Sequence, residues 1–292
     1  MAVTPFDKIV VPLDGSTMAD STLLALRTSL RPLYNHLVLV TALGEDQGEH
    51  AISEAQVYLP HSDLVAAFEL RMGKLAAALT ADGIPASTQV HSTAPYDAIG
   101  KAIAGDLTIN AVALTTHGRW GFGHRRLGRI SERVLRHLAP PLLFVPPGYE
   151  PPVASDGAPR RVERILVPID DHHDSLSVNF RVKAFADAYQ AKVDLLYVDR
   201  TTKTTVLSDF DRQVVLDRAA VEFNKAGIKV ETHHRIGRNV ESQVLAGIAE
   251  RKSDLVVMAT HGRAGLFRWL FGSHAESLLP RLHVPVLVAR VG

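Results

Sequence analysis

The chain has 292 residues, of which 46% are hydrophobic and 22% are charged, with 32 lysines and arginines against 31 aspartates and glutamates. This is a globular composition, which excludes a disordered, coiled-coil or collagen-like chain, and the balanced charge gives no overall attraction to nucleic acid. The absence of cysteine excludes disulfides, zinc–thiolate sites, iron–sulfur clusters and a cysteine nucleophile. At about 150 residues per domain, we expect two domains. We find no apolar signal core in residues 1–8 and no run long enough to span a membrane, so we expect a cytoplasmic protein without a membrane partner.

Short apolar runs alternate with longer amphipathic segments along the chain. In the first half the runs, which we predict to be strands, cover residues 8–13, 37–41, 86–90, 111–115 and 142–145. In the second half they cover residues 165–169, 193–198, 229–232, 255–259 and 285–289. Each run is continuous and rich in valine, isoleucine and leucine, which is typical of parallel strands covered by helices on both faces. The alternation predicts an α/β fold with two tandem doubly wound, Rossmann-like domains, each built on a five-stranded parallel sheet.

Four segments of the first half recur in the second half in the same order. Residues 9–16 (IVVPLDGS) recur as residues 165–172 (ILVPIDDH) at an offset of 156. The other three matches share an offset of 144: residues 82–84 with 226–228, 116–119 with 260–263, and 141–145 with 285–289. The stretch between the copies is rich in proline and glycine and has no apolar period. The repeat therefore predicts domains at residues 1–147 and 161–292, joined by a linker at residues 148–160.

Several known phosphate-binding and catalytic motifs are absent. The sequence has no GxxxxGK[ST], no intact GxGxxG, no GxSxG and no HExxH. His117 and His261 occupy the same place in the two halves, but neither has an identifiable nucleophile beside it, and we favour a loop-shaping role. Residues 170–174 (DDHHD) carry side chains that bind metals, but consecutive side chains rarely converge on one ion, so we expect no metal site. We identify no catalytic residue and expect a protein that is no enzyme, or at most a slow ATPase.

A glycine-containing loop follows the fourth predicted strand of each half. In the second half, Gly262 is followed by nine residues and then by Gly272 and Ser273, which begin a predicted helix over residues 273–281. Glycine lets the backbone approach a ligand closely, and a helix N-terminus presents free N–H groups that suit a phosphate. Ser273 and Glu276 also have the spacing of a capping box, a role that is compatible with a phosphate contact.

The first half repeats this loop with Gly118, nine residues and Gly128, and adds strong positive charge. Against one acid, Glu132, the loop and the following helix carry six arginines: Arg119, Arg125, Arg126, Arg129, Arg133 and Arg136. These arginines could bind phosphates or form a solvated face, and the sequence leaves both interpretations open.

Both halves resemble the universal stress protein family. The family carries a Val-Pro-x-Asp run at the end of its first strand, matched here by residues 11–14 and 167–170. It also carries a Gly-x-His-Gly, nine-residue, Gly-Ser/Thr loop after its fourth strand. The resemblance covers nearly the whole chain and implies the Rossmann-like fold of the adenine nucleotide α-hydrolase type. It further implies a stress-response protein that binds ATP, with or without Mg, as a regulatory ligand.

The resemblance also implies which residues bind the adenine nucleotide. In the second half they are Pro168, Asp170, Val198, Met258, Ala259, Gly262, Gly272, Ser273 and His274. In the first half they are Pro12, Asp14, Val40, Thr115, Gly118, Gly128, Arg129 and Ile130. The first half departs from the family pattern at Thr115, which is bulkier than the expected glycine, and at Arg129, which replaces the serine or threonine. We therefore expect ATP chiefly in the C-terminal domain.

The last predicted strand of each half is strongly apolar, and an exposed edge of that kind invites pairing. We expect the two halves to pack through residues 141–145 and 285–289 as an internal pseudo-dimer, and the whole chain to form a homodimer. The alternative function left open by the sequence is a nucleotide-independent, dimerising interaction module.

Overall fold

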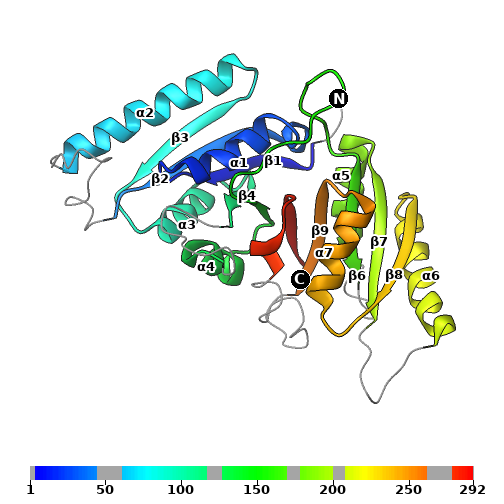
Figure 1. Cartoon of the computed structure of the whole chain (residues 1–292). Coiled ribbons are helices and arrows are strands. Elements are labelled where there is room, and N and C mark those ends of the chain that lie inside the picture. Colours follow the sequence, from blue (N-terminus) through cyan, green and yellow to red (C-terminus); the bar gives the residue numbers. More distant parts are fainter. Residues whose placement is uncertain are drawn as a thin grey trace.

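The computed structural model describes residues 4–44, 61–116, 127–169, 178–199, 208–261 and 278–291, in which strands and helices alternate (Figure 1). The first half contains β1 (Phe6–Pro12), α1 (Thr17–Arg27), the 3-10 helix η1 (Arg31–Leu33), β2 (Tyr34–Ala42), α2 (His61–Ala81), β3 (Ala86–His91), α3 (Pro95–Gly105), β4 (Ile109–Thr115), α4 (Arg129–His137) and β5 (Leu142–Val145). The second half contains β6 (Arg164–Ile169), α5 (Asn179–Tyr189), β7 (Lys192–Asp199), α6 (Asp209–Lys225), β8 (Val230–Ile236), α7 (Val240–Arg251), β9 (Leu255–His261), the 3-10 helix η4 (Leu279–Arg281) and β10 (Val286–Val291). Each of the ten predicted strands is present.

The ten strands form one sheet in the order β3-β2-β1-β4-β5-β10-β9-β6-β7-β8. Within each half the strands are parallel and follow the doubly wound order 3-2-1-4-5, which confirms the predicted fold class. The direction of winding reverses between β1 and β4, and again between β6 and β9. Ligands of doubly wound sheets bind beyond the carboxyl ends of the strands at such switch points.

The two halves meet through an antiparallel pairing of β5 with β10, in which Leu143 lies opposite Leu287. This confirms the predicted pairing of the two last strands within one chain. Because the pairing is antiparallel, the strands of the two halves run in opposite directions. The carboxyl ends of the strands in one half therefore point the opposite way from those in the other half.

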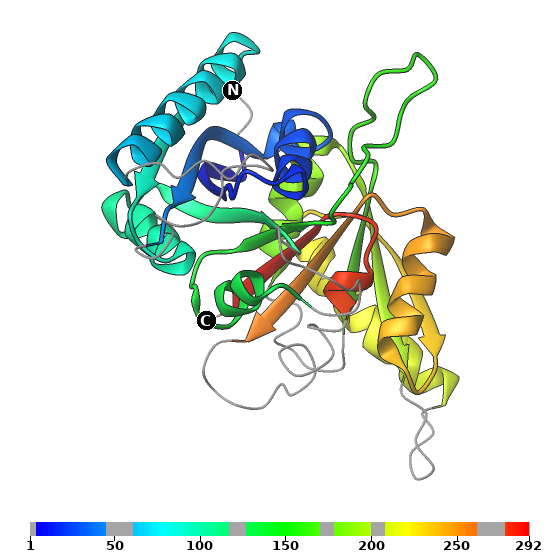
Figure 2. The same cartoon turned by 60° about the vertical axis from the view of Figure 1, so that its left-hand side comes forward.

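Helices cover both faces of the sheet (Figure 2). On one face, α1, α2, α5 and α6 bury their apolar sides, and on the other face α3, α4 and α7 do so. Successive strand residues enter opposite layers, as Val11 and Val10 of β1 do, and both are completely buried. Burial on both sides explains why the strands are continuous apolar runs. In the described ranges, no helix combines the length and the apolar character needed to cross a bilayer.

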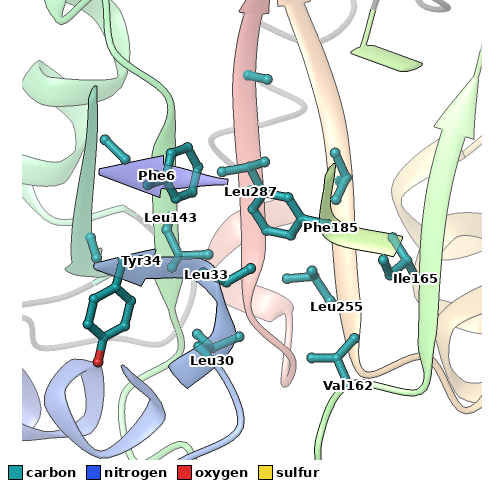
Figure 3. Packing of buried hydrophobic residues seen from close by; sticks show 14 of the residues in the cluster. Phe6, Leu30, Leu33, Tyr34, Leu143, Val162, Ile165, Phe185, Leu255 and Leu287 are labelled. Carbon is teal, nitrogen blue, oxygen red and sulfur yellow. The ribbon is translucent and has the colours of Figure 1, made fainter. Parts of the chain in front are cut away.

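The first of these two layers continues across the junction between the halves (Figure 3). Phe6 of β1 contacts Phe185 of α5 edge-to-face, with ring centroids 5.6 Å apart and an interplanar angle of 80°. Leu33, Leu143 and Leu287 belong to the same buried cluster. An aromatic pair of this kind adds about 0.5–1.5 kcal/mol beyond its buried area. The two halves therefore share a hydrophobic core as well as a sheet.

The predicted linker is anchored at both ends. At its start, the Gly148 N–H donates to Ser21 Oγ at 2.9 Å, and the hydroxyl of the buried Tyr149 lies 3.1 Å from Ser29 Oγ. At its end, the Arg160 guanidinium donates to Asp254. These contacts attach the start of the linker to α1 and the turn after it, and its end to the loop before β9.

Candidate functional site

The described part of the candidate site in the first half lies at the carboxyl ends of β1, β2 and β4. Pro12, the last residue of β1, is in register with Val40 of β2. On the other side of β1, β4 ends at Thr115. The switch point therefore brings together three of the strand-end residues that the sequence predicted.

Asp14 lies at the exposed rim of this site, in the loop after β1. Its Oδ1 accepts hydrogen bonds from the Ser16 N–H at 2.9 Å and from the Ser16 hydroxyl at 2.6 Å. Gly15 between them has φ of 76°, in the left-handed region that favours glycine. The loop thus holds a carboxylate beside the end of β1, where it can accept hydrogen bonds from a ligand.

The amino end of α4 rests on the end of β4. The Gly128 N–H donates to the Thr116 carbonyl oxygen at 2.9 Å, and the Ser131 hydroxyl donates to the Thr115 carbonyl oxygen at 2.8 Å. Gly128 is the N-cap of α4, and no side chain caps the helix. The first-turn N–H groups of a helix lack intrahelical partners and attract anions. This arrangement gives the predicted residues Gly128, Arg129 and Ile130 a place at the switch point.

Ser131 is a residue that the sequence analysis missed. The sequence gives little indication of its role, because Ser131 is simply a serine in the first turn of the helix, on the side that is buried in the structure. Its hydrogen bond to the end of β4 fixes the position of the helix start, so it positions the candidate site without itself facing a ligand.

Two arginines of α4 already have partners within the protein. The guanidinium carbon of Arg133 lies 4.1 Å from the centroid of the Tyr96 ring in α3, and Arg136 forms an ion pair with Glu132 at 2.9 Å. Arg129, at the first helical position, is exposed. Of the other predicted residues in this loop, His117, Gly118, Arg119, Arg125 and Arg126 lie outside the described residues.

Val40 and Thr115 are nearly buried, with 2% and 8% of their surfaces exposed. The Val40 carbonyl oxygen accepts a hydrogen bond from the Leu13 N–H at 2.8 Å, which ties the end of β2 to the end of β1. The role of both residues at a nucleotide stays a prediction.

In the second half, the structure describes the strand ends but not the loops. Pro168, Val198, Met258 and Ala259 lie at or near the ends of β6, β7 and β9. Pro168 is in register with Leu196, so Leu196 is equivalent to Val40, and Val198 lies two residues further along its strand. Outside the described residues lie Asp170, Gly262, Gly272, Ser273 and His274, with residues 273–277 of the predicted helix.

Comparisons with known proteins agree with this architecture. The model of the universal stress protein family matches the chain twice, at residues 5–146 and at residues 161–290. The chain belongs to the universal stress protein family. It is 27% identical to the universal stress protein MJ0531 of Methanocaldococcus jannaschii over 139 residues, which are 44% of this chain and 82% of that protein. The double match makes this chain a tandem member of the family.

Solved universal stress proteins share the fold over both halves. The crystal structure of one from Archaeoglobus fulgidus DSM 4304 matches with a TM-score of 0.72 at 19% identity and covers 98% of each chain. The structure of a putative universal stress protein from Pseudomonas aeruginosa UCBPP-PA14 matches with a TM-score of 0.62 at 16% identity, over 98% of this chain and 93% of that one. At such low identity, these likenesses establish the two-domain fold alone.

A buried ion pair distinguishes the second universal stress protein domain at the carboxyl end of β7. Arg212 Nη1 of α6 lies 2.6 Å from Asp199 Oδ2 at the end of β7, and 7% and 4% of these residues are exposed. The Asp199 carbonyl oxygen also accepts a hydrogen bond from the Gly237 N–H at 3.0 Å. The sequence analysis missed this ion pair. The only indication of it in the sequence is that Arg212 lies on the apolar side of its helix.

A second charged cluster of this universal stress protein lies at the other edge of the same half. Asp194, Glu231 and His233 place potential metal-ligand atoms within 4.8 Å of one another. Two guanidinium groups already bind these carboxylates. Arg164 donates from Nε and Nη2 to the two oxygens of Asp194, both at 3.0 Å, and Glu231 Oε2 accepts from Arg164 at 3.1 Å and from Arg251 at 2.9 Å.

The electrostatics of this cluster favour an ion-pair network over a metal site. Burial raises the pKa of the Asp194 carboxyl, but the hydrogen bonds from Arg164 and His233 and the positive charges of Arg164 and Arg251 together hold that pKa below its ordinary value. The cluster lies near the amino ends of β6 and β7, far along the strands from the switch point. It is therefore separate from the candidate ligand site.

Proposed function

We propose that this universal stress protein responds to stress by binding ATP as a regulatory ligand, chiefly in its C-terminal half. The observation that carries the proposal is the position of α4: its N-terminus is held at the end of β4 by the hydrogen bond from the Gly128 N–H to the Thr116 carbonyl oxygen. It sets a helix N-terminus, which suits phosphates, beside the strand ends that would bind adenine and ribose. The second half has the same strand order, so Gly272 and Ser273 would take the equivalent position after β9.

Each residue then has a role that its chemistry suits. Pro12 and Pro168 would contact the adenine, and Asp14 and Asp170 would accept hydrogen bonds from the ribose hydroxyls. The helix N-termini would bind the phosphates through backbone N–H groups. In the part of the chain that the structure describes we identify no base that would activate water, so the proposed role is binding of ATP, with at most slow hydrolysis.

The preference for the C-terminal half rests on Ser273. A serine hydroxyl at the helix start can donate to a phosphate, and a hydrogen bond to a charged group contributes about 1.5–3 kcal/mol. The equivalent Arg129 has no hydroxyl, and its exposed, flexible side chain must be ordered before it can bind. A difference of this size corresponds to about tenfold or more in affinity.

Calorimetric titration of the full chain with ATP, after removal of any nucleotide that co-purifies, tests this proposal. Gly272→Val should block the close approach of the backbone and lower the affinity by about tenfold or more. Gly128→Val is the matched control in the other half and should leave the tighter site unchanged. Circular dichroism establishes that both variants are folded.

Three outcomes would overturn the proposal. Unchanged ATP affinity in folded Gly272→Val would show that the second loop is not the phosphate site. A larger loss in Gly128→Val would make the arginine-rich first half the better site. No co-purified nucleotide and no heat of binding in the wild type would favour the nucleotide-independent interaction module.

A further inference from the structure

The outermost helix of the second half carries an apolar side that the fold does not bury. The inner side of α6 packs into the core through Leu216, Ala219 and Phe223. On the opposite side, Phe210, Val214 and Val221 are 76%, 49% and 50% exposed. Figure 1 shows α6 at the end of the sheet farthest from α2. Exposed side chains at helical spacing lie along one side of a helix.

Two charged residues lie in the middle of this strip. Asp217 and Arg218 are both exposed and stand between Val214 and Val221. Asp217 accepts a hydrogen bond from Gln213 at 2.7 Å, and Arg218 forms no ion pair within the part of the chain that the structure describes. We call the five residues Phe210, Val214, Asp217, Arg218 and Val221 the outer strip.

The first half shows that the fold does not require the outer strip. At the repeat offset of 144, the equivalent residues on α2 are Ala66, Leu70, Gly73, Lys74 and Ala77. The alignment is anchored by Gly83 and Gly227, which follow the two helices with φ of 77° and 79°. The two helices take equivalent places in their domains, yet large apolar residues replace two alanines only in α6. This difference points to a contact that only α6 makes.

The middle of the outer strip, from Val214 to Val221, is complementary to itself. When two α6 helices lie antiparallel about a two-fold axis between Asp217 and Arg218, Val214 faces Val221 of the partner subunit. In the same arrangement, Asp217 faces Arg218 of the partner subunit. Each contact occurs twice, and a two-fold contact of one surface with itself closes as a dimer.

We propose that two copies of this chain dimerise through antiparallel contact of their outer strips. An α6 of 17 residues is about 25 Å long at 1.5 Å per residue. A single helix pair therefore belongs to the small interfaces, below about 1,200 Å² in total. The dimer is consequently weak and depends on concentration. It does not involve the switch points, so it stands independently of ATP binding.

Sedimentation velocity of the full chain over a range of concentrations tests the proposal. Val214→Glu places two unpaired charges in the apolar contact and should weaken the dimer by about tenfold or more. The matched control is Leu70→Glu, the equivalent position on α2, which is 62% exposed and should leave the dimer unchanged. Melting curves establish that neither change unfolds the chain.

Charge reversal tests the predicted register. Asp217→Arg or Arg218→Asp alone brings like charges together twice and should weaken the dimer by roughly fivefold. Both changes in one chain restore opposite charges across the axis and should return the dimer to within about twofold of wild type.

Several results would overturn the proposal. A chain that stays monomeric at every concentration has no such dimer, and a dimer insensitive to Val214→Glu uses another surface. If the wild-type chain grew into assemblies longer than a dimer, and Leu70→Glu abolished that association, the contact would be head-to-tail, between α6 of one copy and α2 of the next. Failure of the double charge reversal to restore the dimer would exclude the antiparallel register.

Discussion

Replacing Asp194 by alanine should destabilise the protein by about 3 kcal/mol, because it removes the anion that several basic groups surround. Asp194 is completely buried. It accepts two hydrogen bonds from Arg164 at 3.0 Å, and its Oδ1 lies 2.9 Å from His233 Nε2. Removing one partner of a buried ion pair costs about 3–5 kcal/mol. The side chains of Arg164, His233 and Arg251 are 23%, 25% and 26% exposed, so water can partly replace the carboxylate, and we expect the lower end of that range.

The same carboxylate makes this effect depend on pH. Burial raises the pKa of Asp194, but its hydrogen bonds with Arg164 and His233 and the charges of Arg164 and Arg251 together lower it more, so the pKa is lower in the folded than in the unfolded protein. Its contribution to stability is therefore complete above the unfolded-state pKa of about 3.9 and is lost as the pH falls through the lower folded-state value. The difference in unfolding free energy between wild type and Asp194→Ala should shrink below about pH 4.

Urea unfolding followed by circular dichroism measures the effect, with free energies extrapolated linearly from the transition. Asp187→Ala is the control, because Asp187 is an exposed acid on α5 that pairs with Lys183 at 2.9 Å, and its loss should cost less than about 0.5 kcal/mol. An Asp194→Ala variant within about 0.5 kcal/mol of wild type would refute the argument that the buried network stabilises the domain.

Two further predictions concern the shared core and a surface carboxylate. Phe185→Ala should cost about 3–5 kcal/mol in the same urea experiment, because Phe185 is buried against Phe6 across the junction, whereas the 59% exposed Phe180→Ala should change little. Equal effects of the two changes would contradict a core shared by the halves. Hydrogen bonds from Lys8 and Thr108 lower the pKa of Asp106 to about 2, so an NMR titration should find that value in the wild type and a higher one in Lys8→Ala. An unchanged pKa in Lys8→Ala would contradict this assignment.

The strands were predictable wherever both sides of a strand are buried. Val10 and Val11 of β1 lie in opposite layers and are both completely buried, so the run of apolar residues marks the strand directly. The edge strand β8 was harder, because it is half exposed. Its prediction ended at residue 232, whereas the strand continues through polar residues to Ile236. A run of apolar residues cannot mark the end of a strand whose last residues are mostly polar or charged.

The candidate site was less predictable than the fold. The strand ends around Pro12 follow from sheet topology, so a motif at a strand end could be placed in advance. The Ser131 hydrogen bond joins residues 16 positions apart, and the ion pair between Asp199 and Arg212 joins residues 13 positions apart. No local sequence spacing identifies such partners. Such contacts depend on how a helix packs on its strands, which a single sequence does not reveal.

The antiparallel junction of β5 with β10 also bears on how the two halves can differ. In a symmetric pair of identical chains, every substitution appears twice, once on each side of the axis. Here the pairing joins two stretches of one chain, so a substitution changes one side only. The first half can keep Val38, Ala66 and Arg129 while the second has Asp194, Phe210 and Ser273 at the equivalent positions. Covalent fusion thus allows the two halves to carry different residues at equivalent positions.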